Sequence, residues 1–186
     1  MKKILIPLFL LLAIPAFNVF VSKLTPQKLP AAFPRFQTSD INGHTVTNEI
    51  FNGRFTVLVM WVTKDEHSRQ LLQALSSWQE TKSANLQIVC LVGDVKTTDT
   101  TKIPVARQIT AGLALPQLLV NDDMTALLTT FKAAPTICFI NPYGQLVGQP
   151  VTGHELELIK KEACRLMAAD SPANIDKSPI MKKLSH

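Results

Sequence analysis

The four consecutive residues Asp65-Glu66-His67-Ser68 carry the side chains of this chain that are best suited to chemistry. Two carboxylates and an imidazole can ligate a metal ion. Successive residues of a helix point about 100° apart, so these three side chains cannot converge on one ion unless a distant ligand such as His44 or His154 joins them. The same geometry keeps this stretch from forming the hydrogen-bonded relay of a hydrolase. We therefore expect neither a catalytic triad nor a metal site from these residues alone.

The same stretch has the signature of a helix start. Thr63 fits the N-cap position and Glu66 lies three residues later, which is the spacing of a capping box. Asp65 and Glu66 also place negative charge at the positive end of the helix dipole. Together such features stabilise a helix by about 1 kcal/mol. The simplest interpretation is a stable, anionic start of a surface helix.

The cysteines Cys90, Cys138 and Cys164 are the remaining candidates for chemistry. Cys90 and Cys138 lie in apolar runs typical of strands, where cysteine usually acts as a small buried hydrophobic residue. Basic neighbours could lower the thiol pKa of Cys164, but its apolar neighbours favour a side chain that faces the core. With three cysteines, at least one stays unpaired within a monomer. In an oxidising compartment this argues that they are shielded.

A strand and a helix must position the four central residues. Residues 55–62 are almost continuously apolar, which is the pattern of a strand covered on both faces. Apolar residues then recur at helical spacing and predict an amphipathic helix over residues 65–81. A second apolar strand over residues 86–92 completes a strand–helix–strand unit, so the two strands should pair in parallel.

The rest of the chain predicts further strands and helices. We expect a hairpin over residues 36–46 with its turn at Asn42-Gly43, and a second turn at Asn141-Pro142-Tyr143-Gly144 between antiparallel strands. The other expected elements are, in chain order, a helix over 105–109, a strand over 115–120, a helix over 124–131, strands over 136–140 and 145–151, and a last helix over 154–168.

Both ends of the chain differ from this central part. A short basic start precedes an apolar run over residues 4–21, so we predict a signal anchor or signal peptide over residues 1–22. The cleavage signal is weak, which favours an uncleaved anchor, and the lysines on its short side place the remainder outside the cytoplasm. A proline-rich linker over 23–34 and a disordered tail over 170–186 flank a single domain over 35–169.

The charge is concentrated at these ends. The net charge of +5 suggests a basic protein. Residues 31–170, however, hold 12 basic and 13 acidic side chains, so the domain itself is close to neutral. Nucleic-acid binding needs a basic face on the folded unit, and the composition gives no reason to expect one. The basic ends instead suit an anionic membrane surface.

The order and spacing of four motifs resemble those of the thioredoxin superfamily, and of its membrane-anchored, extracytoplasmic TlpA-type branch in particular. The motifs are Met60-Trp61 before the first long helix, Asn121-Asp122-Asp123 before a helix, Ala134-Pro135-Thr136, and Phe139-Ile140-Asn141 followed by Gly144. The resemblance implies an α/β fold, a three-layer α/β/α sandwich with a central mixed β-sheet. It also implies that the strand over 56–61 lies between the strands of Cys90 and Cys138, which would keep these two cysteines too far apart for a disulfide.

The resemblance also implies a functional site with two hallmarks, a dithiol and a cis-proline, and this chain lacks the dithiol. The family carries a Cys-x-x-Cys dithiol whose two positions correspond here to Asp65 and Ser68. Neither a carboxylate nor a hydroxyl exchanges disulfides. The family's other hallmark corresponds to Pro135, which the resemblance implies is cis. The backbone before that proline is implied to pair with an extended partner segment, and this contact needs no sulfur.

The expected function follows from this mismatch. We expect a membrane-tethered extracytoplasmic domain, secreted if the signal is cleaved, that has no enzymatic dithiol and no cofactor. It would bind another extracytoplasmic protein through a patch formed by Trp61, His67, Ala134 and Pro135. One alternative is a thiol–disulfide oxidoreductase or peroxidase-like enzyme that uses a non-standard cysteine. Another is an extracytoplasmic metal-handling protein.

Overall fold

The computed structural model describes residues 32–170. The predicted signal segment over 1–22, nearly all of the linker and nearly all of the tail lie outside these residues. Between residues 32 and 170, no helix has the length and the apolar character needed to cross a bilayer.

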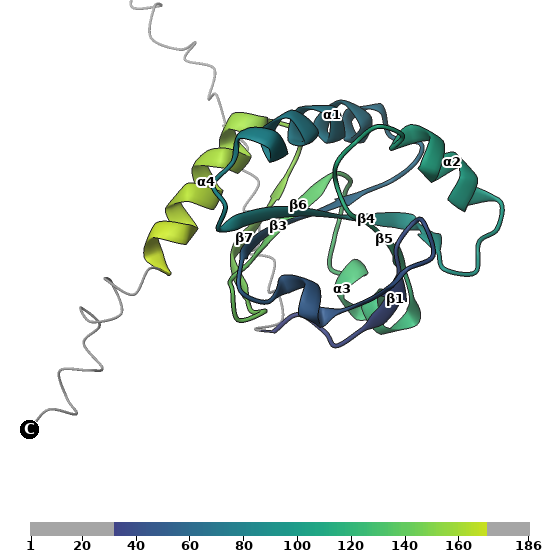
Figure 1. Cartoon of the computed structure of the whole chain (residues 1–186), viewed down its shortest axis with the longest axis horizontal. Helices are drawn as coiled ribbons and strands as arrows, with labels where there is room; N and C mark the ends of the chain where they lie inside the picture. The colour runs from purple at the N-terminus through teal and green to yellow at the C-terminus, as the bar shows by residue number, and fades with distance from the viewer. Residues whose placement is uncertain (1–31, 171–186) are drawn as a thin grey trace, which may run out of the picture.

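A five-stranded mixed sheet forms the centre of the fold (Figure 1). Its strands, in spatial order, are β5 (Gln117–Val120), β4 (Leu86–Lys96), β3 (Phe55–Trp61), β6 (Thr136–Ile140) and β7 (Leu146–Thr152). β3, β4 and β5 are parallel, β6 is antiparallel to β3, and β7 is antiparallel to β6. The predicted strand–helix–strand unit and the predicted terminal hairpin are both confirmed.

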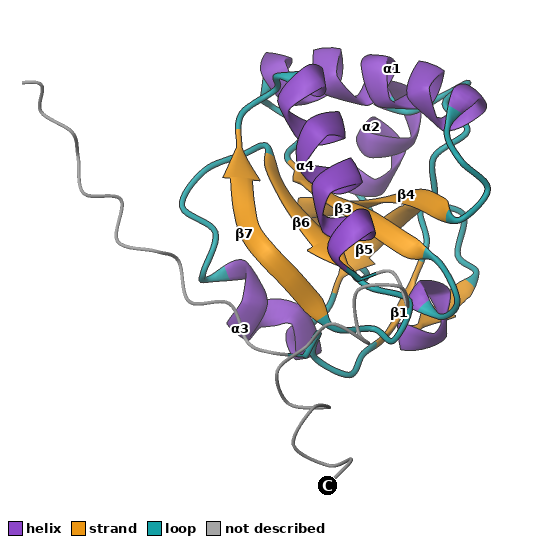
Figure 2. Cartoon of the chain, turned by 90° about the vertical axis from the view of Figure 1, so that its left-hand side faces the viewer, coloured by secondary structure: helices purple, strands orange, loops and turns teal. Residues whose placement is uncertain are grey.

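Helices cover both faces of the sheet (Figure 2). One face carries α1 (Glu66–Thr81), α2 (Lys102–Ile109) and α4 (Leu156–Ala169). The other carries the short α3 (Thr125–Leu128) with the 3-10 turn η2 (Asp122–Met124), the two-stranded sheet of β1 (Gln37–Ser39) and β2 (Thr45–Thr47), and the 3-10 turn η1 (Asn48–Phe51). The expected three-layer arrangement is therefore confirmed.

Each face of the sheet packs against its own hydrophobic core. Alternate residues of β3 face the two sides, which explains its continuous apolar sequence: Val59 joins the core under α1, and Leu58 joins the core beside α3. Cys90 belongs to the first core and Cys138 to the second. β3 lies between their strands, so they are separated by two strand spacings, roughly 9.6 Å, and cannot form a disulfide with each other.

Several element boundaries differ from the prediction. Phe33, placed in the linker by its sequence context, packs edge-on against Phe36 and Phe51, so the folded part extends beyond residue 35 towards the N-terminus. The predicted helix over 124–131 is reduced to α3, because the hydroxyls of Thr129 and Thr130 donate to backbone carbonyls three residues earlier, next to the point where the helix ends.

The bounds of α2 and of β4 also differ from the expected ranges. α2 begins at Lys102, earlier than residue 105, because the Asp99 carboxylate accepts a hydrogen bond from the Lys102 backbone N–H. β4 extends beyond residue 92 to Lys96, with an irregularity in its pairing to β5 over this extension.

Candidate functional site

The start of α1 and the loop before β6 lie at the same edge of the sheet. α1 follows the carboxyl end of β3, and Met60 near that end pairs with Thr136, the first residue of β6. The Ala134–Pro135 peptide bond just before β6 is cis, as the resemblance implied. The sheet thus brings together the two regions whose motifs the sequence singled out.

The N-cap of α1 is Asp65, and the predicted capping box at Thr63 was wrong. The Asp65 carboxylate accepts a 2.6 Å hydrogen bond from the backbone N–H of Ser68. The pKa of Asp65 is lowered, first by the Ser68 side chain and further by this N–H and by the charges of His67 and His154, while burial opposes the shift. A negative charge is therefore held at the helix start.

Thr63 instead fixes the loop that precedes the helix. Its backbone N–H and its hydroxyl both donate to the Asp94 carboxylate of β4, at 3.0 and 2.6 Å. On the other side, the Arg69 guanidinium donates to the Thr63 carbonyl at 3.0 Å. This Thr63–Asp94 pair ties the start of α1 to the neighbouring strand, so the backbone at the site is anchored from two elements.

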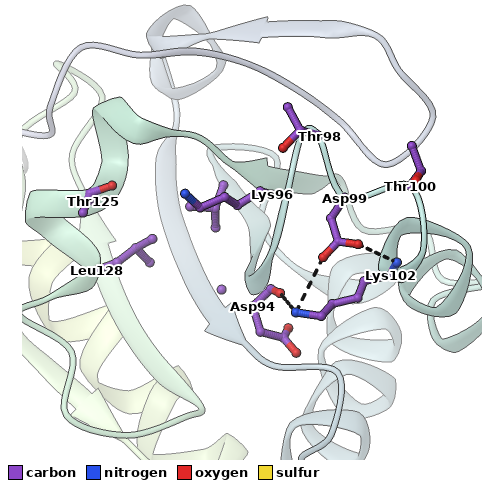
Figure 3. A pocket seen from close by; sticks show the side chains of 10 residues that line it. Asp94, Lys96, Thr98, Asp99, Thr100, Lys102, Thr125 and Leu128 are labelled. Carbon is purple, nitrogen blue, oxygen red and sulfur yellow. Dashed lines mark hydrogen bonds and ion pairs between the residues drawn. The ribbon is translucent and has the colours of Figure 1, made fainter.

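Asp94 also lines an open groove of about 660 Å³ at the carboxyl ends of β4 and β5 (Figure 3). Lys102 also lines it, and its ammonium donates to the Asp94 carbonyl at 3.0 Å and pairs with Asp99 at 3.6 Å. Lys96 pairs with the exposed Asp122 at 3.3 Å. The side chains that line the groove include two acidic ones, Asp94 and Asp99, and two basic ones, Lys96 and Lys102, so their formal charges balance.

Ser68, which the sequence resemblance aligned with the second dithiol position, is fully buried. Among residues 32–170, its hydroxyl makes no hydrogen bond of ordinary geometry, although it lies close enough to the Asp65 carboxylate to lower the pKa of that group. The side chain therefore fills space beneath the helix start and is not presented to a partner or substrate.

His154 lies directly against His67, an arrangement that sequence spacing could not reveal. The two rings are stacked, with centroids 4.5 Å apart and planes inclined by 14°. Gly153, the residue before His154, donates its N–H to the Pro135 carbonyl at 3.1 Å. The His67–His154 pair therefore bridges the start of α1 and the cis-proline loop. His44 lies elsewhere, on the β1–β2 turn with Asp40.

The expected contact residues divide into exposed and buried ones. His67 is exposed and Ala134 is half-buried. In the part of the chain that the structure describes, the backbone N–H and carbonyl of Ala134 have no hydrogen-bond partner. Pro135 is buried, and Trp61 is fully buried with its indole N–H donating to the Gln117 side chain at 3.0 Å. Trp61 therefore supports the site from within the core and offers no surface to a partner.

None of the three cysteines lies at the start of α1. Burial raises the pKa of Cys90 and that of Cys138 to about 12, so both remain thiols at neutral pH. Cys164 is exposed, which corrects the expectation that it faces the core: Ala163 and Leu166 take the inward positions of α4. Cys164 is also eight residues beyond the first residue of α4, about 12 Å along the helix axis.

The residues described include no group of three or more histidine, cysteine or acidic side chains arranged to hold a metal ion. The alternative of a metal-handling protein stays a hypothesis from the sequence. The structure brings one further imidazole, that of His154, next to His67 in this stretch.

Comparisons with known proteins give matches in structure alone. No protein-family model and no curated protein matches the chain. Mycobacterium tuberculosis DsbF superposes with a TM-score of 0.59 and 16% identity, over 75% of this chain and 99% of that chain. The exposed lipoprotein thioredoxin Etrx1 of Streptococcus pneumoniae superposes with a TM-score of 0.53 and 17% identity, over 68% of this chain and 98% of that chain. A secreted M. tuberculosis disulfide oxidoreductase homologous to E. coli DsbE superposes with a TM-score of 0.54 and 13% identity, over 70% of this chain and 95% of that chain. Identities this low concern the fold and carry no activity with them.

Proposed function

We propose that this chain is an accessory protein that binds another protein and exchanges no disulfides. The proposal starts from its fold, which is the thioredoxin-like fold of thiol–disulfide oxidoreductases. The contact surface consists of His67, His154 and the Ala134 backbone, which we call the loop-and-helix surface. The patch expected from the sequence contained Trp61, His67, Ala134 and Pro135. His154 is now added to it, and the buried Trp61 and Pro135 support it from within.

Within residues 32–170, the backbone N–H and carbonyl of Ala134 have no hydrogen-bond partner, and this observation carries the proposal. Ala134 is partly exposed and precedes β6 at the end of the sheet, where its backbone N–H and carbonyl can pair with an extended segment of another chain. Such main-chain hydrogen bonds supply affinity without a cysteine. The two histidine rings beside the loop add a flat surface against which side chains of the partner can pack. An extended polypeptide segment is therefore the ligand that fits best.

The absence of sulfur at the two dithiol positions supports binding over catalysis. Asp65 and Ser68 have no accessible redox couple, and Asp65 is already engaged as the helix cap. The thiols of Cys90 and Cys138 are protonated and buried. The alternative of a non-standard cysteine rests on Cys164 alone, since it is the exposed one.

We further propose that the domain acts on the outer face of a membrane, held by the apolar segment over residues 1–22. The support is the sequence of that segment, together with the printed descriptions of two similar structures as a secreted oxidoreductase and an exposed lipoprotein. Protease added to intact spheroplasts should digest the domain while residues 1–22 stay with the membrane. Protection of the domain until the membrane is opened would contradict this location.

Site-directed photo-cross-linking on intact membranes tests the contact. A photoreactive residue at position 67 should yield a discrete adduct, and the same residue at the exposed His44 should not. Ala134→Arg, which blocks the approach of a partner strand, should abolish the adduct. The matched variant Ala84→Arg, at an exposed alanine between α1 and β4, should leave it unchanged. Equal adducts from positions 67 and 44, or insensitivity to Ala134→Arg, would contradict the proposal.

An insulin-reduction assay separates the enzymatic alternative. The full chain should reduce insulin no faster than the reductant alone, and Cys164→Ser should not change that rate. Activity above this background that Cys164→Ser removes would favour an oxidoreductase with a non-standard cysteine.

A further inference from the structure

We infer that the groove at the carboxyl ends of β4 and β5 is a second part of the contact with the partner protein. It receives an uncharged polar side chain of the extended segment that pairs with Ala134. This second contact rests on the proposed function and specifies the chemistry of the partner. The position of the groove, its free hydroxyls and its balance of charge support the assignment.

The groove lies at the same edge of the sheet as the loop-and-helix surface. Its lining begins at Gly93, directly after Val92, which pairs with Trp61 at the end of β3. β4 and β5 are two and three strand spacings from β6, which is roughly 10 and 14 Å. An extended chain advances about 3.3 Å per residue, so a segment paired with Ala134 reaches the groove roughly three to five residues farther along.

Two lining residues connect the groove to the loop-and-helix surface. Leu128 of α3 is one of them, and the chain continues from it through the α3–β6 connection to Ala134. Asp94 is the other, and its carboxylate binds the backbone N–H and the hydroxyl of Thr63, just before α1. The groove therefore adjoins both segments that build the loop-and-helix surface.

Three threonines offer hydrogen bonds within the groove. Thr98, Thr100 and Thr125 line it and are exposed (Figure 3). Within residues 32–170, their hydroxyls have no hydrogen-bond partner. A hydroxyl can both donate and accept a hydrogen bond. Together with the half-buried Leu128, these hydroxyls suit a side chain that carries an amide or a hydroxyl on a short apolar stem, such as glutamine or threonine.

The charges that line the groove give no advantage to a charged side chain. They balance formally, and each is already engaged. Lys102 pairs with Asp99 at 3.6 Å, and Lys96 pairs with Asp122 at 3.3 Å. The Asp94 carboxylate accepts two hydrogen bonds. A charged side chain would have to displace one of these partners or leave its own charge unpaired, whereas an uncharged polar one does neither.

Photo-cross-linking from the groove in intact membranes tests the position of the contact. A photoreactive residue at position 98 should give an adduct, and the cross-linked peptide should belong to the same segment of the same partner that position 67 captures. Thr81 is the matched control, because it is an exposed threonine roughly 22 Å along α1 from the start of that helix, and it should give no adduct.

The two positions separate failure of the groove contact from failure of the proposed function. An adduct from position 67 with none from position 98, or with a different partner at position 98, would overturn the groove contact alone. No adduct from either position would contradict the proposed function and the groove contact with it.

Substitutions in the groove test the chemistry of its occupant. Thr98→Asn keeps an uncharged polar group and should leave the adduct yield from position 67 unchanged. Thr98→Asp and Thr98→Lys should each lower that yield about fivefold or more, because the partner would cover a new, unpaired charge. Thr125→Trp, which fills the groove from α3, should lower it as well, and Thr81→Trp should not.

The pattern of these yields decides the assignment. Circular dichroism of each variant should match that of the parent, because positions 98, 125 and 81 are exposed. Opposite effects of Thr98→Asp and Thr98→Lys would show that the groove takes a charged side chain. Yields unchanged by both of them and by Thr125→Trp would show that the segment does not enter the groove. Either result would overturn the inference.

Discussion

At position 65 a carboxylate occupies the place where the resembled family carries a thiolate. A helix N-terminus stabilises either anion through the same free N–H groups and the same dipole. In this chain the anion is part of the helix cap, since Asp65 accepts the Ser68 N–H at 2.6 Å. The start of α1 thus holds a negative charge on a carboxylate.

Replacing Asp65 should therefore destabilise the fold in a pH-dependent way. Asp65→Ala should lower the unfolding free energy by about 1 kcal/mol at neutral pH, and Asp65→Asn, which retains a capping oxygen, by about half of that. The folded-state pKa of Asp65 lies below its ordinary value of 3.8, so the stabilisation by the ionised group is present above that value and is lost as pH falls through the folded pKa. Urea unfolding of parent and variants between pH 7 and pH 2.5 measures this. A parent–Asn difference that stays constant below about pH 4 would contradict it.

The cysteines should differ sharply in reactivity. At pH 8, a thiol of pKa about 12 is ionised to about one part in ten thousand, so Cys90 and Cys138 should resist iodoacetamide in the folded chain. The exposed Cys164 should react. Mass spectrometry should find one label per folded chain, none on Cys164→Ser, and three on the unfolded parent. A labelled Cys90 or Cys138 in the folded chain would show that its strand opens readily.

Residue-level prediction succeeded where a side chain acts locally and failed where a distant partner intervenes. The anionic helix start could be predicted, but the capping residue could not. The sequence favoured Thr63 as the N-cap. Its backbone N–H and hydroxyl instead both donate to Asp94, which lies 31 residues later in the chain. The stacking of His67 on His154 is likewise invisible in sequence because it joins segments far apart in the chain.

At the scale of elements, the site depends on how the β3–α1 connection is held. Two charge-assisted hydrogen bonds from Thr63 reach Asp94, and a third bond from Arg69 reaches the Thr63 carbonyl. The helix start is thereby fixed relative to β4. The cis-proline loop is fixed separately through Gly153. The loop-and-helix surface is thus built from two independently anchored segments.

Removal of the Asp94 carboxylate should loosen the helix start. Asp94→Ala leaves both Thr63 donors without their acceptor and should lower the unfolding free energy by about 1.5–3 kcal/mol. Asp122→Ala, which breaks an exposed pair with Lys96, should change it by less than about 1 kcal/mol. Amide hydrogen exchange should accelerate over residues 63–69 in the first variant only. Equal effects of the two substitutions would contradict the role given to Asp94.

Periodicity identified the strands and long helices but not their ends. β3, β6 and α1 were predictable because their apolar patterns extend over their whole length. α3 was predicted too long, because its apolar spacing continues past the point where threonine hydroxyls compete for the backbone carbonyls. Side-chain hydrogen bonds of this kind decide boundaries and leave no periodic signal.

For the whole molecule, strand order followed from a few local rules and a resemblance. A parallel strand–helix–strand unit and a terminal hairpin leave few ways to build one mixed sheet, and the observed order places β3 between β4 and β6. Function could not be predicted to the same degree. It depends on which backbone groups have no partner in the described part of the chain, such as those of Ala134, and on which side chains are buried, such as Trp61.

The contact that we propose for this thioredoxin-like domain needs no sulfur. Photo-cross-linking from position 67 in intact membranes, repeated in the Cys164→Ser chain, tests it most directly because Cys164 is the exposed cysteine. We predict the same adduct at the same yield as in the parent, unaffected by reductant. Loss of the adduct on removal of Cys164, or on reduction, would show that the contact runs through a disulfide and would contradict the account.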